Sequence, residues 1–266
     1  MDSTTNSNYI FADHQDDAEW QRLQQIETIF DPRTRGFLQD LGIDKGHHCL
    51  EIGFGACGVL QWMLEQVGPS GHVTGVDLST TFLRGLSAAN LTIHEASILD
   101  QEIAADSFDF IHGRYVFVFV PEIRAVLKKL RNALKPGGWI LLEEIDFSCA
   151  RPNDPTSIGG QAFVKLREAI RVMFASDGMD YSFGRQLASL LPEAGFRNVA
   201  KEHYAPTVPG GSAVAELMRV SSLKLRDVYE RGGAITATAF DAYLDFCCDP
   251  EQTATHYDTI SSWGQK

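Results

Sequence analysis

The feature that most restricts the fold is a short apolar segment that runs into three closely spaced glycines and then into a helical pattern. The segment is Cys49–Ile52, the glycines are Gly53, Gly55 and Gly58, and apolar side chains recur at helical spacing over 59–64. This order predicts a strand, a tight turn and a helix. Glycine is required where the backbone turns with positive φ or where a ligand lies directly on the main chain. Free N–H groups at the start of the helix would point toward that ligand, so the turn predicts a nucleotide site, and the spacing alone also fits a dinucleotide.

A carboxylate, Glu51, stands two positions before Gly53 in a strand that we expect to be buried. Central strands of parallel sheets are usually apolar, and burying a charge is costly unless a partner compensates it. A pyrophosphate over the turn would be repelled by this carboxylate, whereas an ammonium or sulfonium group would be attracted. The residue therefore favours a cationic ligand. The alternative is a Glu51 paired with a lysine or arginine of another element.

The composition narrows the possible partners. The chain has 266 residues, 44% of them hydrophobic, and a net charge of −12 without a basic run. This length suits one sizeable α/β domain with additions, or two small domains, and the acidic balance argues against nucleic-acid binding. The five cysteines lack C-x-x-C spacing and the eight histidines lack metal-ligand spacing, so we expect a reduced, cytoplasmic protein without a metal site. No stretch approaches the ~20 apolar residues of a transmembrane helix and no signal peptide is evident, so we expect no membrane association.

Apolar spacing along the chain predicts the remaining elements. Two helices, broken at Asp31-Pro32, precede the sheet. Strands and helices then alternate through residue 147, and Leu134–Gly138 is expected to stop one helix and turn. A sixth strand starts near residue 195 and a final, antiparallel strand covers 256–263. The predicted fold class is α/β, with a doubly wound, mostly parallel seven-stranded sheet of the Rossmann-like kind and helical lid additions.

A second acidic residue, Asp77, ends the strand that begins at His72 and lies roughly 20 residues beyond Gly58. An acidic residue at this position is placed to accept hydrogen bonds from a ribose diol. Alternatively, Asp77 caps a helix starting near Thr81, a role for which Ser79 is equally suited. The agreement between the spacing and the glycine turn favours ribose contact.

With these residues in place, the chain resembles the class I S-adenosylmethionine-dependent methyltransferases, most closely small-molecule members of the ubiquinone/menaquinone methyltransferase type. The resemblance covers roughly residues 45–147 and rests on four segments in order, Leu50–Gly55, Val76–Ser79, Ser107–Asp109 and Leu134–Gly138. It implies S-adenosyl-L-methionine as the cofactor. It also implies methyl transfer to O, N or C of a small, apolar or aromatic metabolite.

The resemblance implies roles for individual residues. Gly53 and Gly55 would let the backbone touch the methionyl part of the cofactor, and Glu51 would hold charge for its ammonium group. Asp77 would accept hydrogen bonds from both ribose hydroxyls. The carbonyl of Arg114 would receive the ammonium.

At the adenine end, Leu78 would lie against the ring face, and Ser97 and Ile98 would meet its edge, the latter through its backbone N–H. Two positions depart from the family pattern. Cys57 stands where many members have glycine, which requires a compatible turn. Ser97 stands where many members have Asp, and a hydroxyl is a weaker acceptor than a carboxylate.

Methyl transfer requires the acceptor in line with the S–CH₃ bond, so positioning and exclusion of water matter more than any one side chain. A base is needed only if the acceptor must lose a proton. The candidate bases are His112 and Glu144, although a histidine within a strand is alternatively a core residue with satisfied nitrogens. Strand alternation directs Glu143 and Glu144 to opposite faces. The candidate substrate-pocket residues are Tyr9, His14, Tyr115 and Asp146.

These inferences divide the chain into four parts. They are an N-terminal arm and helical cap (1–46), the S-adenosylmethionine-binding core (47–205), a helical insertion or lid (206–254) and the final strand of the core sheet (255–266). Three functions remain open: a methyltransferase, which we favour, a nicotinamide-dependent oxidoreductase, and a cofactor-binding protein that no longer transfers methyl groups. The methyl acceptor and the oligomeric state do not follow from the sequence.

Overall fold

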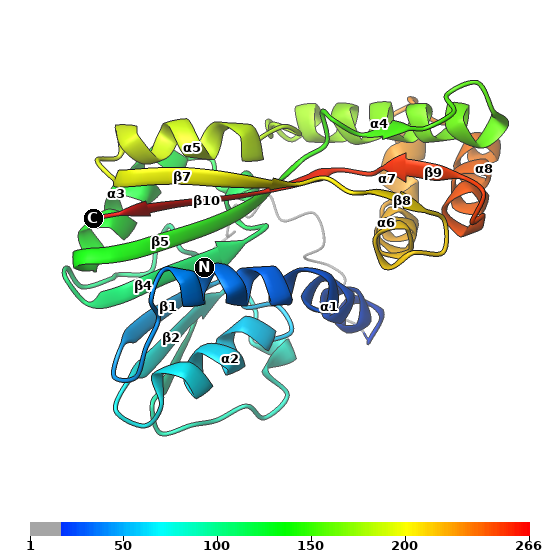
Figure 1. The fold of residues 1–266 in the computed structure, drawn as a ribbon. Coiled ribbons are helices and arrows are strands. Elements are labelled where there is room, and N and C mark those ends of the chain that lie inside the picture. The colour runs from blue at the N-terminus through cyan, green and yellow to red at the C-terminus, as the bar shows by residue number, and fades with distance from the viewer. Residues whose placement is uncertain (1–16) are drawn as a thin grey trace, which may run out of the picture. The chain divides into compact units, whose positions relative to one another are not determined.

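A seven-stranded sheet forms the centre of the fold in the computed structural model, which describes residues 17–266 (Figure 1). The strand order is β3-β2-β1-β4-β5-β10-β7. The bounds are β1 His48–Ile52, β2 His72–Asp77, β3 Leu91–Glu95, β4 Phe108–Arg114, β5 Leu134–Asp146, β7 Arg197–Tyr204 and β10 Asp258–Gln265. The chain builds outward from β1 to β3 and then returns to the other side of β1 with β4. The reversal places a topological switch point at the carboxyl end of β1, where ligands of such sheets bind.

Strand direction confirms the predicted fold class. β1 pairs in parallel with β2 and β4, β2 with β3, and β4 with β5. The last strand runs the other way, because Gly137 N donates to Lys266 O and Lys266 N donates to Gly138 O, which joins the start of β5 to the end of β10. Helices α1 (Asp17–Asp40) and α2 (Gly58–Val67) lie on one face of the sheet, and α3 (Ile123–Ala133) and α5 (Gly184–Glu193) on the other (Figure 1).

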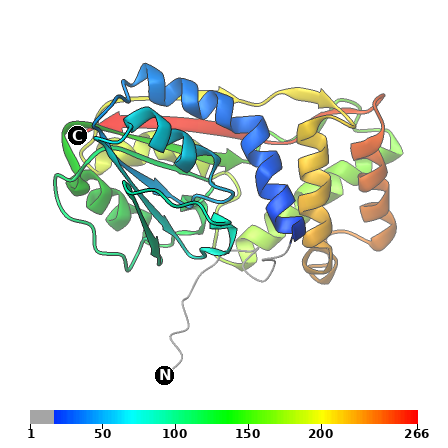
Figure 2. The same cartoon turned by 90° about the horizontal axis from the view of Figure 1, so that it is seen from below.

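The predicted break at Asp31-Pro32 is wrong, because α1 continues through Pro32 as a single helix. Proline removes one helical hydrogen bond and bends a helix without necessarily ending it. The bend of α1 is visible in Figure 2. Buried residues lie on both sides of the proline, among them Phe30 and Leu38, so packing against the sheet holds both halves helical.

The segment Leu134–Gly138 also differs from the expected turn. α3 stops before it at Ala133, as predicted, but the segment is already the first part of β5. Its pairing with β4 is irregular, with a register shift between Phe108 and Phe110, and Gly137 has φ +85°. The hydrogen bonds with Lys266 at the end of the chain explain why a turn-forming sequence is extended here.

The chain divides into two compact units. Among the described residues, one comprises 17–144, 186–202 and 261–266, and the other comprises 145–185 and 203–260. The second unit contains α4 Ile158–Ser176, α6 Ala213–Lys224, α7 Arg226–Arg231 and α8 Ala237–Cys248, with a small antiparallel sheet of β6 Arg151–Pro152, β8 Thr207–Pro209 and β9 Thr253–Thr255. Our four-part division of the sequence, which put α4 in the core, stays a prediction. The Phe163 ring of α4 lies 5.5 Å from that of Phe246 in α8. The lid role of 206–254 stays a prediction.

Two glycine substitutions test this packing with opposite expected signs. A Cβ at Gly113 in β4 would lie 2.8 Å from Phe117 Cε2 and 3.1 Å from Ile52 O, so Gly113→Ala should lower the free energy of unfolding by about 1–3 kcal/mol. A Cβ at Gly36 in α1 would meet nothing within 4 Å, so Gly36→Ala should raise it by about 0.5–1 kcal/mol. Urea unfolding measures both, and equal effects would contradict the packing described.

Candidate functional site

The glycine turn has the conformation that its sequence predicts. Gly53, Gly55 and Cys57 have φ values of 71°, 51° and 74°. The turn is closed by two hydrogen bonds, from Gly53 N to Val76 O (2.8 Å) and from Cys57 N to Phe54 O (2.7 Å). Cys57 thus adopts the left-handed backbone conformation that glycine adopts more readily. The turn therefore accommodates a cysteine at the position where many family members have glycine.

Asp77 fixes the turn from the end of β2. Its carboxylate accepts hydrogen bonds from Gly55 N (3.3 Å) and Ser79 N (3.1 Å). Burial raises its pKa to about 6. The backbone N–H groups of Leu78 and Phe54 also bond the carboxylate and lower its pKa, so a ribose diol would share its oxygens with these donors. The helix-cap alternative is not supported, because only a 3₁₀ turn follows at Thr81–Leu83, without a side-chain cap.

The residues expected at the adenine end lie at the same edge of the sheet. Asp77 pairs with Glu95, so the ends of β2 and β3 are neighbours. Leu78 is 43% exposed, which is unusual for a large apolar residue and leaves a face for an apolar ring. Ser97 Oγ accepts a hydrogen bond from Leu99 N (3.2 Å), and Ile98 is buried. Their contact with adenine stays a prediction.

Glu51 is paired with a histidine, so the alternative of a lysine or arginine partner is wrong. Its Oε2 lies 2.7 Å from His112 Nδ1, and His112 Nε2 lies 3.1 Å from Glu143 Oε2. None of the three side chains is more than 3% exposed. Burial lowers the pKa of His112, but Glu51 and Glu143 outweigh it and raise the value to about 9. The ring is therefore an imidazolium that donates to both carboxylates at neutral pH.

The same network ties α1 to the sheet. Glu143 accepts hydrogen bonds from Thr34 of α1 and from Ser261 Oγ of β10, the latter at 2.8 Å. Arg114 donates from Nη1 to Thr34 Oγ1 (2.9 Å) and from Nη2 to Asp31 Oδ1 (2.7 Å). Burial opposes ionisation of Glu143, but its bond to His112, with Arg114 and Thr34, lowers its pKa to about 2. Buried charges of opposite sign thus hold α1 beside the glycine turn.

The prediction of His112 as a general base does not fit this geometry, because both ring nitrogens are engaged and the side chain is fully buried. Glu144 as a base stays a prediction, because its Oε2 is buried without a hydrogen-bond partner among the described residues. Its Oε1 accepts from Val116 N (2.9 Å) and Phe117 N (2.6 Å), and burial raises its pKa to about 8. Val116 Cγ2 would lie 2.2 Å from a Cβ at Gly53, so Glu144 holds this segment against the turn. Both residues position other parts of the site.

α1 supplies a carboxylate that the sequence analysis missed. Glu27 Oε1 accepts a hydrogen bond from Gly58 N at 2.7 Å, at the start of α2. Burial raises its pKa to about 7, against the lowering effect of the Gly58 hydrogen bond. The signal for it was the four-residue spacing of Leu23, Glu27 and Asp31, which places all three on one side of a helix.

The predicted substrate-pocket residues are distributed differently. Tyr9 and His14 lie outside the described residues. Tyr115, just after β4, has φ +58° and packs edge-on against Phe30 of α1 with ring centroids 5.7 Å apart. Strained non-glycine conformations of this kind concentrate at functional sites. Asp146 belongs to the second unit, where its Oδ1 accepts from Ser148 N at 2.7 Å.

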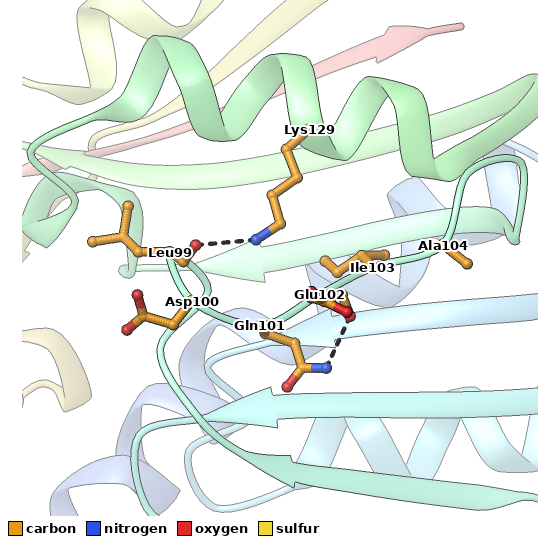
Figure 3. Close-up of a pocket in the computed structure, with 7 residues that line it drawn as sticks. All are labelled: Leu99, Asp100, Gln101, Glu102, Ile103, Ala104 and Lys129. Carbon is orange, nitrogen blue, oxygen red and sulfur yellow. Dashed lines mark hydrogen bonds between the residues drawn. The ribbon is translucent and has the colours of Figure 1, made fainter.

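An open depression of about 680 Å³ lies over the segment that connects β3 to β4 (Figure 3), and no residue of the glycine turn lines it. It is lined by Leu99, Asp100, Gln101, Glu102, Ile103, Ala104 and Lys129. Lys129 Nζ is occupied by the carbonyls of Ile98 and Leu99, at 2.9 and 3.2 Å. We place the site at the turn, because backbone donors and acidic side chains meet there. Within residues 17–266 no group of His, Cys, Asp or Glu side chains is arranged to hold a metal, and no helix is long and apolar enough to cross a membrane.

Comparison with known proteins identifies the class. Residues 20–201 match the family model of a methyltransferase domain, and the chain belongs to that family. Demethylmenaquinone methyltransferase of Staphylococcus aureus is 26% identical over an alignment of 204 residues, and the match covers 68% of this chain and 78% of that protein. The chain is an S-adenosylmethionine-dependent methyltransferase of the class I, small-molecule type.

Solved structures share the fold. Phosphoethanolamine N-methyltransferase 2 of Haemonchus contortus, bound to phosphomonomethylethanolamine and S-adenosylhomocysteine, superimposes with a TM-score of 0.58 at 17% identity, covering 92% of this chain. This chain spans only 56% of that protein. The [4+2]-cyclase SpnF gives a TM-score of 0.53 at 16% identity, covering 89% of this chain and 80% of that one. The fold is thus shared with a protein that is named for a different reaction.

Removing the buried histidine tests the network. His112→Leu leaves Glu51 and Glu143 buried without their cation, so it should lower the free energy of unfolding by about 3–5 kcal/mol at neutral pH. Because the folded pKa of His112 is raised from 6.5 to about 9, its stabilisation is complete below pH 6.5 and is lost as the pH rises through about 9. The difference between wild type and variant in urea unfolding should therefore shrink over that range.

The matched control is His203→Leu. His203 Nδ1 lies 2.6 Å from Asp258 Oδ2, but its side chain is 48% exposed. Exposed pairs contribute at most about 1 kcal/mol. Equal losses in the two variants would mean that the Glu51–His112–Glu143 network does not stabilise the fold as described.

Proposed function

We propose that this methyltransferase transfers the methyl group of S-adenosylmethionine to a small, apolar or aromatic acceptor, with the glycine turn and Asp77 holding the cofactor. The proposal depends most on one observation. The glycine turn and Asp77 lie together at the switch point of the sheet, and the Asp77 carboxylate accepts a hydrogen bond from Gly55 N. The relative named for demethylmenaquinone supports an apolar acceptor.

The residues present fit the cofactor. Gly53 and Gly55 are partly exposed and would contact the methionyl part, Asp77 would accept from the ribose alongside its backbone donors, and Leu78 offers an apolar face to adenine. Bound S-adenosylmethionine supplies an electrophilic methyl group on a positively charged sulfur. The carboxylates beside the turn favour such a cation and disfavour the phosphates of a dinucleotide.

In this proposal, the rate acceleration comes from positioning the methyl acceptor against the cofactor. His112 is engaged at both ring nitrogens, so the chain acts mainly by holding the acceptor in line and excluding water, an effect worth ~7–11 kcal/mol at best. Glu144, with Oε2 unpartnered, is the remaining candidate base. Tyr115 stands nearest in sequence to the Arg114 carbonyl that is expected to receive the ammonium. Its constrained backbone and its packing on Phe30 keep the ring in one place.

Calorimetry of the purified chain tests the cofactor part of the proposal. S-adenosylmethionine and S-adenosylhomocysteine should bind and NAD should not. Asp77→Ala should weaken binding of both adenosyl ligands tenfold or more, from the ~1.5–3 kcal/mol worth of hydrogen bonds to a charged group. Asp100→Ala, which removes an exposed carboxylate from the depression over the β3–β4 connection, should leave binding unchanged. Unchanged affinity in Asp77→Ala would discard the ribose assignment.

A labelled methyl donor tests the acceptor class. Incubation of the chain with the donor and an apolar metabolite extract should move label into a product that partitions into organic solvent. Label transferred only to water-soluble acceptors would overturn the apolar assignment. Intact binding without any transfer would favour the cofactor-binding protein that lacks methyl transfer.

A further inference from the structure

Glu27 lies directly against the glycine turn. Its Oε1 accepts from Gly58 N at 2.7 Å, and a Cβ at Gly58 would lie 2.9 Å from its Oε2. One helical turn earlier, Leu23 Cδ2 would lie 3.6 Å from a Cβ at Gly55. The first N–H groups of α2, which attract anions, therefore already have a carboxylate of the same chain beside them.

The charge of Glu27 is not balanced by an ion pair. Arg35 is bonded to Asp31 (3.0 Å), and Arg114 is bonded to Asp31 and Thr34. Within residues 17–266, Glu27 has the Gly58 N–H as its hydrogen-bond partner and makes no ion pair, and Arg114 and Arg35 act on its charge only through space. The side chain is half-buried, so its charge is less screened than that of a surface carboxylate.

We propose that Glu27 is a specificity-determining residue that makes this site prefer S-adenosylmethionine to its product S-adenosylhomocysteine. The inference rests on the proposed function. The two ligands share their adenosyl and methionyl parts and differ by one methyl group and one positive charge at sulfur. An unpaired carboxylate at the turn therefore attracts the substrate more than the product, and its effect weakens once the methyl group has left. Glu27 thus raises the affinity for the substrate relative to that for the product.

The preference should depend on pH through Glu27. The carboxyl is ionised above its pKa of about 7, so the ratio of the dissociation constants, product over substrate, should rise as the pH increases through that value. The groups facing Glu27 are Asp31 and Arg35 on α1, Arg114 on β4 and the thiol of Cys57 in the turn. Asp77, with a pKa raised to about 6, is expected to contact the ribose, which both ligands share, so its titration cancels in the ratio.

Glu27→Gln isolates the charge, because the amide oxygen can still accept from Gly58 N. Calorimetry with both ligands measures the ratio of their dissociation constants, product over substrate, at about pH 6 and about pH 8. In wild type this ratio should be at least about fivefold higher at the upper pH. In Glu27→Gln the ratio should be the same at both values and equal to the low-pH ratio of wild type. Glu65→Gln removes a charge from the exposed side of α2 and should behave like wild type.

If Glu27→Gln gives the same ratio as wild type at the upper pH, the proposal is overturned and Glu27 is a helix cap only. Absence of S-adenosylmethionine binding to wild type would instead refute the proposed function itself. A second measurement does not depend on the variant folding. In ¹³C-glutamate-labelled wild type, S-adenosylmethionine should lower the pKa of the carboxyl that titrates near 7 and S-adenosylhomocysteine should not, and equal shifts would likewise overturn the proposal.

Discussion

The imidazolium of His112, held between Glu51 and Glu143, is the interaction on which the arrangement of the site depends. It compensates the carboxylate that ends β1 just before the glycine turn, and it fixes the carboxylate that bonds Thr34 of α1. An isolated buried carboxylate costs several kcal/mol, and His112 is the cation that directly contacts both acids, with Arg114 adding to the compensation of Glu143. Strand register delivers the pairing, since Glu51 lies opposite His112 in adjacent parallel strands. The position of α1 beside the turn follows from it.

This network changes how the acidic character of the site is understood. Glu51 is neutralised from within the sheet, so its charge is available to a ligand only in competition with His112. Glu27, supplied by the helix that the network holds in place, keeps an unpaired charge at the turn. Glu144 acts on the other side by bonding the backbone of the segment that packs on Gly53. The sequence analysis attributed a preference for a cationic ligand to Glu51. In the structure, we attribute that preference to Glu27 instead.

The parts of the site that the sequence could predict are those set by local spacing. The turn at Gly53 and Gly55 and the placement of Asp77 follow from strand, turn and helix patterns over about 30 residues. What it could not predict depends on pairing between distant segments. The partners of His112 depend on strand register, and Glu27 reaches the turn because α1 continues through Pro32. The grouping of α4 with the helical unit depends on its packing against α8, which no local pattern reveals.

The protonation state of His112 tests the account most directly. In ¹⁵N-histidine-labelled protein at pH ~7.5, both ring nitrogens of His112 should give the chemical shifts of protonated nitrogen, since two carboxylates hold its pKa near 9. The His112→Leu spectrum assigns the signal by its loss. A ring that is neutral at this pH, or that titrates near 6.5 like an unperturbed histidine, would contradict the account, because Glu51 and Glu143 would then be buried without a compensating cation.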